Sequence, residues 1–153
     1  MDRLSHVDDT GKARMVNVGG KEEVSRRARA RGKIRMSPEA LTAVRDNQVA
    51  KGDVLTVAQI AGIQAAKETA SLIPLCHPLV LDGIDVHLCV TEDGVEAESE
   101  VRCVGRTGVE MEALTAVSVA LLAVYDMCKA IDKAMSIGDV RLVEKVKGHA
   151  KQG

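Results

Sequence analysis

The sequence predicts a single α+β domain whose elements follow the order strand, helices, strand, strand, helix, strand. Its 153 residues are enough for one domain with a substantial core and too few for two ordinary domains. The prediction rests on an alternating hairpin around Asp93-Gly94 and on a charge-free helical run from Ala113 to Tyr125. This order is the ferredoxin-like β-α-β-β-α-β pattern, with an antiparallel sheet and one extra helix.

The N-terminal part of the chain contains an arm, a strand and a helix. Residues 1–20 are polar and glycine-containing, which indicates a mobile arm. A basic segment with alternating apolar residues at its end predicts a strand over Val24–Met36. Ser37 can then serve as the N-cap of a helix, with proline and glutamate after it. We expect this helix to end near Asn47.

A second helix and a stiff loop follow. Asp53 can cap a helix that reaches Lys67. The segment Ile73–Pro78 contains two prolines, and each biases its predecessor toward extended geometry. We therefore expect a loop, not a helix, before the hairpin.

The hairpin is the clearest local signal. Asp93-Gly94 is typical of a two-residue type I′ turn, which pairs Glu92 with Val95 and fixes the register. The further pairs expected are Val90 with Ala97, Leu88 with Ser99, Val86 with Val101, Ile84 with Cys103, Asp85 with Arg102, His87 with Glu100 and Cys89 with Glu98. This register keeps Cys89 and Cys103 apart, so we expect no disulfide between them.

The C-terminal part completes the pattern. Gly105 and Gly108 interrupt the second hairpin strand, and a long helix is expected over about Val109–Ala134. A last strand should cover Ile137–Val146, and the lysine-rich residues 147–153 should form a flexible tail.

Composition argues against several classes of function. The net charge is −1, with no Trp or Phe and one Tyr, so the chain lacks the charge and the aromatic faces of a nucleic-acid platform. The longest charge-free run is shorter than the roughly 20 residues of a membrane span, and the N-terminus lacks the apolar core of a signal peptide. The four cysteines have no C-x-x-C spacing and indicate reduced thiols. We expect a cytoplasmic protein without nucleic-acid or membrane partners.

Asp126 and Lys129 directly follow the charge-free run. At this spacing on a helix they lie on one face and within reach of each other. In an apolar setting such groups need a partner and their pKa values shift readily, which suits proton transfer. From the pattern alone, a structural ion pair that closes the helix explains them equally well.

Five other charged or polar positions attract attention, each with a plainer explanation beside the functional one. Lys51 and Lys67 lie near the two ends of the second helix, and the plainer explanation is that each is an ordinary solvent-exposed lysine. His77 lies in the proline-containing loop, where it either contacts a ligand or is bonded locally. Glu110 and Glu112 lie in the first turn of the long helix, where the helix dipole alone favours carboxylates.

Five ordered blocks of sequence stand out together, and they cover Lys51–Val54, Ile60–Lys67, Leu72–Leu79, Thr107–Ala116 and Tyr125–Ala130. These blocks resemble the cyclic pyranopterin monophosphate synthase family, which is also called molybdenum cofactor biosynthesis protein C. The resemblance extends from about Ser5 to Lys145. It implies a lyase that converts (8S)-3′,8-cyclo-7,8-dihydroguanosine 5′-triphosphate, the product of an upstream radical enzyme, to cyclic pyranopterin monophosphate and diphosphate, with no cofactor.

The resemblance also implies roles for individual residues. Asp126 and Lys129 match the catalytic pair. The positions that match substrate-contacting segments or charged positions around the pocket are Leu75, Cys76, His77, Met111, Glu112, Lys51, Lys67, Arg26, Glu110 and Lys145. The family forms a homohexamer, a trimer of dimers, with its sites at dimer interfaces.

Elementary chemistry agrees with these roles. A triphosphate carries about four negative charges, which lysine and arginine side chains can neutralise through strong charge-assisted contacts. We expect Lys129, with a pKa lowered in a tight site, to act as general acid and base, and Asp126 to orient it and share its proton. No set of histidines and cysteines has the spacing of metal ligands, so we expect no metal. Glu112 and Asp126 should lie about 21 Å apart along one helix, which favours a site shared by two chains.

The sequence departs from the family pattern in two places, and two other classes of function fit the predicted topology. Asn17 stands where the family has Asp, which removes a charge, and the tail after Lys145 also differs. A non-catalytic nucleotide-binding regulatory module is the alternative function, and it would leave the substrate unchanged. An RNA-binding module of the same topology is disfavoured by the missing aromatic residues.

Overall fold

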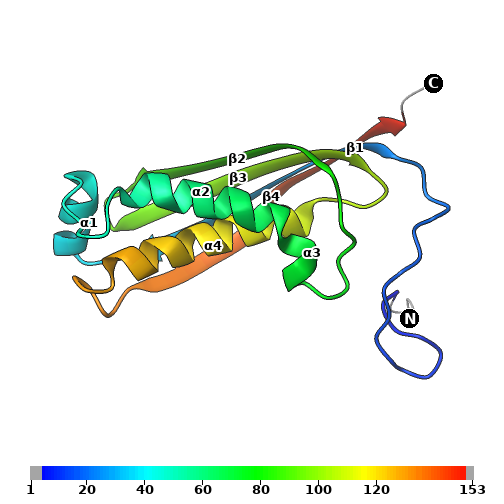
Figure 1. Ribbon diagram of the computed structural model, residues 1–153, viewed down its shortest axis with the longest axis horizontal. Coiled ribbons are helices and arrows are strands. Elements are labelled where there is room, and N and C mark those ends of the chain that lie inside the picture. The colour runs from blue at the N-terminus through cyan, green and yellow to red at the C-terminus, as the bar shows by residue number, and fades with distance from the viewer. Residues whose placement is uncertain (1–4, 151–153) are drawn as a thin grey trace.

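Helices cover one face of a four-stranded antiparallel sheet in the computed structural model, which describes residues 5–150 (Figure 1). The elements are β1 (Val24–Arg35), α1 (Pro38–Arg45), α2 (Val54–Lys67), α3 (Thr69–Leu72), β2 (Leu81–Val90), β3 (Gly94–Gly105), α4 (Glu110–Cys128) and β4 (Ser136–Ala150). The strand order is β2-β3-β1-β4. Each pair of strands joined through helices is therefore separated by another strand, which confirms the predicted ferredoxin-like pattern.

Alternation along β1 separates a core face from a charged face. Ala28 and Ile34 are buried beneath the helices, whereas Arg29, of opposite parity, pairs with Glu98 on the other face of the sheet. Most of the basic segment thus belongs to an ion-pair network. Arg26 has the parity of the core face, so it lies on the side of the sheet that the helices cover.

Two antiparallel helices, α2 and α4, form the main part of the second layer. At Gly62 they approach so closely that a Cβ would lie 2.9 Å from the Ala116 carbonyl oxygen. Because the helices run in opposite directions, the start of α2 lies beside the end of α4 (Figure 1). By length and composition α4 could span a membrane, but it packs against β1 and α2, as a core helix does.

The predicted helix starts are confirmed. The Ser37 side chain accepts a hydrogen bond from the backbone of Ala40 at 3.2 Å, and Asp53 does the same for Thr56 at 3.2 Å. The first helix ends at Arg45, close to the predicted end.

The hairpin exists, but its predicted register is wrong by two residues. Val90 pairs with Val95 and not with Ala97. The observed pairs are Cys89 with Glu96, Leu88 with Ala97, His87 with Glu98, Val86 with Ser99, Asp85 with Glu100, Ile84 with Val101, Gly83 with Arg102 and Leu81 with Cys103. A slip of two keeps every side chain on its own face, so the core-facing set is as predicted. All four cysteines are free.

The turn explains the slip. The Thr91 N–H donates to the Gly94 carbonyl at 2.8 Å, which places Glu92 and Asp93 in the turn. Gly94 instead begins β3, where a Cβ would collide with the Ile34 carbonyl of the neighbouring strand. A glycine is thus required at this position because the backbone of β1 lies so close, and not because of the turn.

The end of α4 also differs from the prediction. The helix ends at Cys128 and not at Ala134. The Asp132 side chain accepts hydrogen bonds from the backbone of Ser37 at 2.7 Å and of Ala134 at 2.9 Å. These contacts hold residues 129–135 in a loop.

The two ends of the chain are only partly described. β4 pairs with β1 as far as Ala150, so residues 147–150, predicted as part of a flexible tail, belong to a strand. In the predicted arm, Val7 and Ala13 form an isolated bridge. Residues 1–4 and 151–153 lie outside the described residues.

Candidate active site

Lys51, Asp126 and Lys129 form one charged cluster at the end of α4. The Lys129 Nζ lies 2.7 Å from Asp126 Oδ1, and the Lys51 Nζ lies 3.0 Å from Oδ2 of the same carboxylate. Lys51 precedes the N-cap of α2, and the antiparallel packing of the two helices brings it to this end. The structure therefore adds a second lysine to the predicted pair.

The electrostatics of this cluster differ from the prediction. The side chains are half exposed, with 56% accessibility for Asp126 and 55% for Lys129. Hydrogen bonds from Lys129 and then Lys51 lower the pKa of Asp126 to about 2, and the Asp126 carboxylate raises the pKa of Lys129. The expectation of a lowered lysine pKa in an apolar setting is wrong for the single chain. At neutral pH Lys129 holds a proton that it can donate.

A buried carboxylate lies at the other end of α4. Glu112 is only 3% exposed; its Oε1 lies 3.7 Å from the Cys76 Sγ, and its Oε2 has no hydrogen-bond partner among the described residues. Burial raises the pKa of Glu112, and burial followed by the Glu112 charge raises the pKa of Cys76 to about 11. Both groups hold their protons more tightly than usual, and Glu112 has a free acceptor for a ligand.

The proline-containing loop brings His77 and Leu75 to the same end. The His77 Nε2 lies 2.6 Å from the Val16 carbonyl oxygen, so the loop is tied to the segment before β1. One residue on, the Asn17 side chain accepts a hydrogen bond from Gly19 at 2.9 Å. Leu75 is partly buried, and the loop is not helical, as predicted.

Arg26, Glu110 and Lys145 also lie at this end. Lys145 pairs with Glu110 at 2.6 Å, and Arg26 donates to the carbonyls of Gly105 at 3.0 Å and Arg106 at 3.2 Å. Burial works to raise the pKa of Glu110, but the hydrogen bond from Lys145, a backbone hydrogen bond and the charges of Lys145 and Arg26 together lower it. Glu110 is thus ionised beside a Glu112 that resists ionisation.

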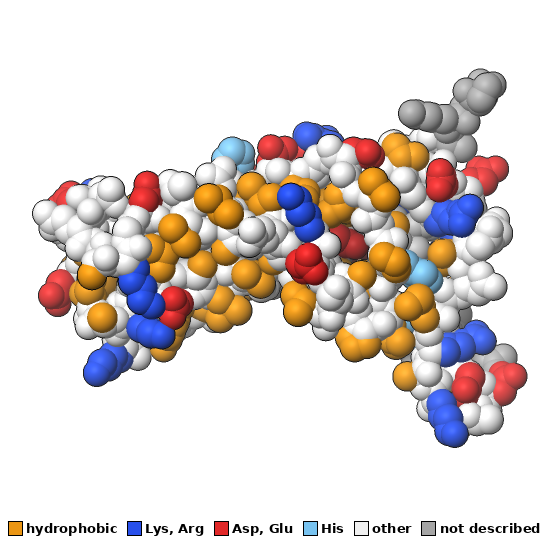
Figure 2. Space-filling model, in the orientation of Figure 1, with side chains coloured by type: hydrophobic (Ala, Val, Ile, Leu, Met, Phe, Trp, Pro, Cys, Tyr) orange, Lys and Arg blue, Asp and Glu red, His pale blue; other side chains and the backbone are white. Residues whose placement is uncertain are grey.

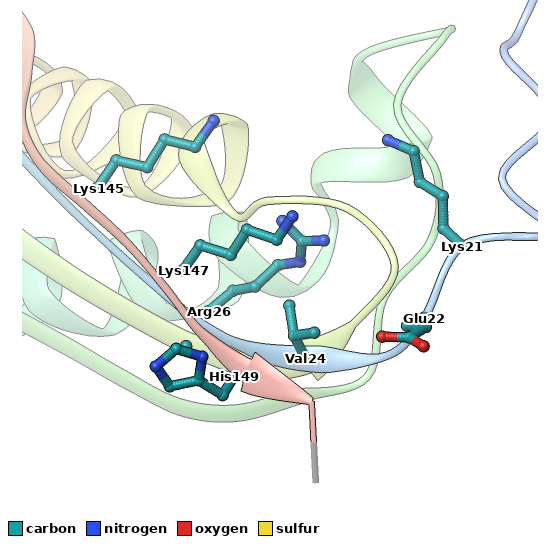
Figure 3. Close-up of a pocket in the computed structure, with 8 residues that line it drawn as sticks. Lys21, Glu22, Val24, Arg26, Lys145, Lys147 and His149 are labelled. Atoms are coloured by element: carbon teal, nitrogen blue, oxygen red, sulfur yellow. The ribbon is translucent and has the colours of Figure 1, made fainter.

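A basic pocket of about 610 Å³ opens next to this group. Lys21, Lys147 and His149 line it together with Arg26 and Lys145 (Figure 3). The first three were not predicted. The alternation of Lys145, Lys147 and His149 is a strand signal, and it could have been recognised had β4 been extended beyond Val146.

The predicted site residues therefore form two groups within one chain. Glu112 and Asp126 are separated by about 21 Å along α4. The other predicted residues lie at one end or the other of the antiparallel pair of helices, α2 and α4. Lys67, at the end of α2, lies on the same side as Met111 at the start of α4. Met111 is 37% exposed. The Lys67 side chain makes no hydrogen bond or ion pair with another described residue. No single chain brings the two groups to one reacting atom.

Comparison with known proteins identifies relatives across nearly the whole chain. The sequence model of the MoaC family matches residues 15–148. A cyclic pyranopterin monophosphate synthase of Heliobacterium modesticaldum is 58% identical over 150 residues, which cover 97% of this chain and 94% of the relative. Relatives of the same name from Novosphingobium aromaticivorans and Roseiflexus sp. are 59% and 55% identical, covering 95% and 98% of this chain and 92% and 96% of the relatives. The chain belongs to the MoaC family.

Proposed function

We propose that this chain is a cyclic pyranopterin monophosphate synthase, a lyase of molybdenum cofactor biosynthesis. Its substrate is (8S)-3′,8-cyclo-7,8-dihydroguanosine 5′-triphosphate, and its products are cyclic pyranopterin monophosphate and diphosphate. The observation that carries the proposal is identity of more than half the residues with relatives of that name over nearly the whole chain. The cluster of Lys51, Asp126 and Lys129 supplies a proton donor and a carboxylate for this chemistry.

Asp126 and Lys129 are the proposed catalytic residues. Opening the imidazole ring, forming the pyrazine and closing the cyclic phosphate all need proton transfer. Lys129 starts protonated and donates its proton first, after which the free amine can accept one. Asp126 holds the ammonium in place, and Lys51 keeps the Asp126 carboxylate ionised through its contact at 3.0 Å.

The second group binds the substrate in this proposal. Its charged and polar members lie at the Glu110 end of α4 and are Cys76, His77, Lys67, Arg26, Glu110, Glu112 and Lys145, with Leu75 and Met111 as apolar contacts. The uncharged form of Glu112, favoured by burial, can donate a hydrogen bond to a ring nitrogen or carbonyl oxygen. Neither a metal nor an organic cofactor is part of the proposed reaction.

A shared site follows from the distance between the two groups. A partner chain that supplies its Asp126 end beside the Glu112 end of the first chain would complete one site. The outer surface of the helical layer supports association, because it exposes Val57 at 43%, Ile60 at 52% and Leu122 at 56% (Figure 2). The proposed assembly is a homohexamer, a trimer of dimers. The proposed location is the cytoplasm, with no nucleic-acid or membrane partner.

The test is turnover of the cyclic nucleotide. The purified protein is incubated with the product of the upstream radical enzyme, and cyclic pyranopterin and diphosphate are measured by chromatography. Formation of both supports the proposal. A non-catalytic regulatory module would bind the nucleotide and leave it unchanged, and that result would overturn the proposal.

A further inference from the structure

The loop after α4 begins with Lys129, and Asp132 ties this loop at three points. The Asp132 backbone N–H donates to the Cys128 carbonyl at 3.1 Å, which closes a tight turn around Lys129. One carboxylate oxygen accepts from the Ser37 N–H at 2.7 Å, and the other accepts from the Ala134 N–H at 2.9 Å. Both oxygens are occupied, so a single residue joins the end of α4, the loop and the start of α1.

The anchor at Ser37 is fixed by the core. Ser37 is the N-cap of α1, and Ile34 before it and Ala40 after it are fully buried. The helix α1 and the loop after α4 lie at the same end of the molecule (Figure 1), but a hollow of about 450 Å³ lies between α1 and Ile131. Among the described residues, the bond to Ser37 is the only hydrogen bond between this loop and α1 or its N-cap. This bond, more than packing against α1, therefore sets where the loop lies.

The position of the Lys129 backbone matters because its side chain has a single polar contact with the described residues. Its Nζ lies 2.7 Å from Asp126 Oδ1, and more than half of the side chain is accessible to solvent. A solvated lysine loses much rotamer freedom in such a contact, so the contact persists only where the backbone directs the side chain toward its partner. Asp126 belongs to α4, and Lys51 holds its other oxygen at 3.0 Å. A movement of the turn would therefore separate Lys129 from Asp126 and leave Lys51 in place.

We propose that Asp132 is a positioning residue for Lys129. Its carboxylate holds the turn after α4 in the conformation that keeps the Lys129 ammonium on Asp126. The effect is transmitted through the backbone, because the described side chains of Asp132 and Lys129 form no ion pair with each other. The use of this arrangement in catalysis rests on the proposed function, whereas the arrangement itself does not.

Amine labelling at pH 8 tests the position of Lys129 without turnover. A limiting amount of acetic anhydride reacts with the free-amine form of each lysine, and peptide mass spectrometry gives the rate at Lys129 relative to Lys133. The contact with Asp126 raises the pKa of Lys129, so Lys129 has less free amine than it would have without this contact. Lys133 is exposed and lies in the same loop, so the ratio corrects for a general change in access to the loop.

Asp132→Asn is the main variant. Asn keeps the size of the side chain but has one acceptor atom, so its amide nitrogen faces one of the two N–H donors. Loss of the Asp126 contact should lower the pKa of Lys129, and half a pKa unit corresponds to about threefold more free amine at pH 8. The labelling ratio should therefore rise about threefold or more. Asp132→Ala, which removes both acceptors, should give a larger rise.

Asp139→Asn is the matched control, because it makes the same chemical change beyond the loop. Asp139 pairs with Arg35 at 3.0 Å, and its described contacts include none of the loop residues. Its labelling ratio should equal that of wild type. The inference is overturned if Asp132→Asn keeps the wild-type ratio, or if Asp139→Asn raises the ratio as much as Asp132→Asn does.

Kinetics separate positioning from stability. In Asp132→Asn, kcat on the cyclic nucleotide should fall by about tenfold to a hundredfold, as expected for a catalytic group displaced by about 1 Å. The KM should stay within about twofold of wild type, because the proposed binding group lies at the other end of α4. Thermal unfolding shows how much of each variant is folded at the assay temperature. An Asp132→Asn protein that unfolds earlier but keeps the wild-type kcat and labelling ratio would assign Asp132 to stability alone and refute the positioning role.

The two readouts also separate this inference from the proposed function. If labelling of Lys129 depends on Asp132 while the wild type leaves the cyclic nucleotide unchanged, the link between Asp132 and Lys129 holds and the enzyme is overturned. If the wild type turns over and Asp132→Asn matches it in kcat and in labelling, the enzyme holds and the link is overturned.

Discussion

Mixing two inactive variants tests whether the site is shared between chains. Glu112→Ala removes a group at one end of α4, and Lys129→Ala removes one at the other end, about 21 Å away at the usual helical rise. If each site uses the Glu112 end of one chain and the Lys129 end of its partner, a mixed dimer contains one intact site and one doubly defective site. Random mixing gives about half mixed dimers, so about a quarter of the wild-type rate should return.

The assay is formation of cyclic pyranopterin after the two variants are unfolded together and refolded, with native mass spectrometry to confirm mixed oligomers. The matched control mixes Lys129→Ala with Asp126→Asn. These defects lie at the same end of α4, so mixing them should restore nothing. The shared-site reasoning is refuted if confirmed mixed oligomers of Glu112→Ala and Lys129→Ala stay inactive, or if the control mixture recovers equally.

Three further predictions concern the carboxylates and metal dependence. Asp126→Asn keeps the shape but cannot hold Lys129 by charge, so kcat at saturating substrate should fall by about 10²–10⁴-fold; a loss under threefold would contradict the role of the pair. Activity should survive exhaustive dialysis against EDTA, and a loss restored by a divalent ion would show that a metal is required. Burial raises the pKa of Glu112 above its ordinary 4.5, so the folded state binds this proton more tightly than the unfolded state. The free energy of unfolding of wild type should therefore fall as the pH rises through 4.5 and the raised pKa. Glu112→Gln should lack this loss, so in urea titrations it should gain stability relative to wild type as the pH rises above 4.5. A difference that stays constant with pH would contradict the burial argument.

Features fixed by neighbouring residues could be predicted from the sequence. Ser37 and Asp53 cap their helices through contacts within three residues, and the proline-containing loop follows from local backbone restrictions. The order of strands and helices follows from periodicity for the same reason. The proximity of Asp126 and Lys129 was predictable because helical spacing alone brings them together.

Features fixed by distant residues could not be predicted. The sequence around Gly94 predicts a turn residue, but a glycine is needed there because the Ile34 carbonyl of β1 leaves no room for a Cβ. Because Gly94 lies in β3 and not in the turn, the hairpin register differs from the prediction by two residues. The proposed catalytic pair of Asp126 and Lys129 is half exposed, and α4 ends at Cys128. The loop that follows the helix is held by a contact of Asp132 with the distant Ser37 backbone, which the local sequence does not reveal. The sequence predicts a tail at Lys147, although the residue belongs to β4. Its strand partner, Arg26, lies near the other end of the chain, so the local sequence does not reveal the pairing.

The most direct test of the central claim compares Lys129→Ala with Lys133→Ala on the cyclic nucleotide. Both lysines are exposed and close in sequence, but only Lys129 contacts Asp126, at 2.7 Å. With each variant confirmed as folded and of wild-type mass, the wild type and Lys133→Ala should release cyclic pyranopterin and diphosphate in equal amounts. Lys129→Ala should release neither. Product formation by Lys129→Ala at a rate near that of Lys133→Ala would contradict the account.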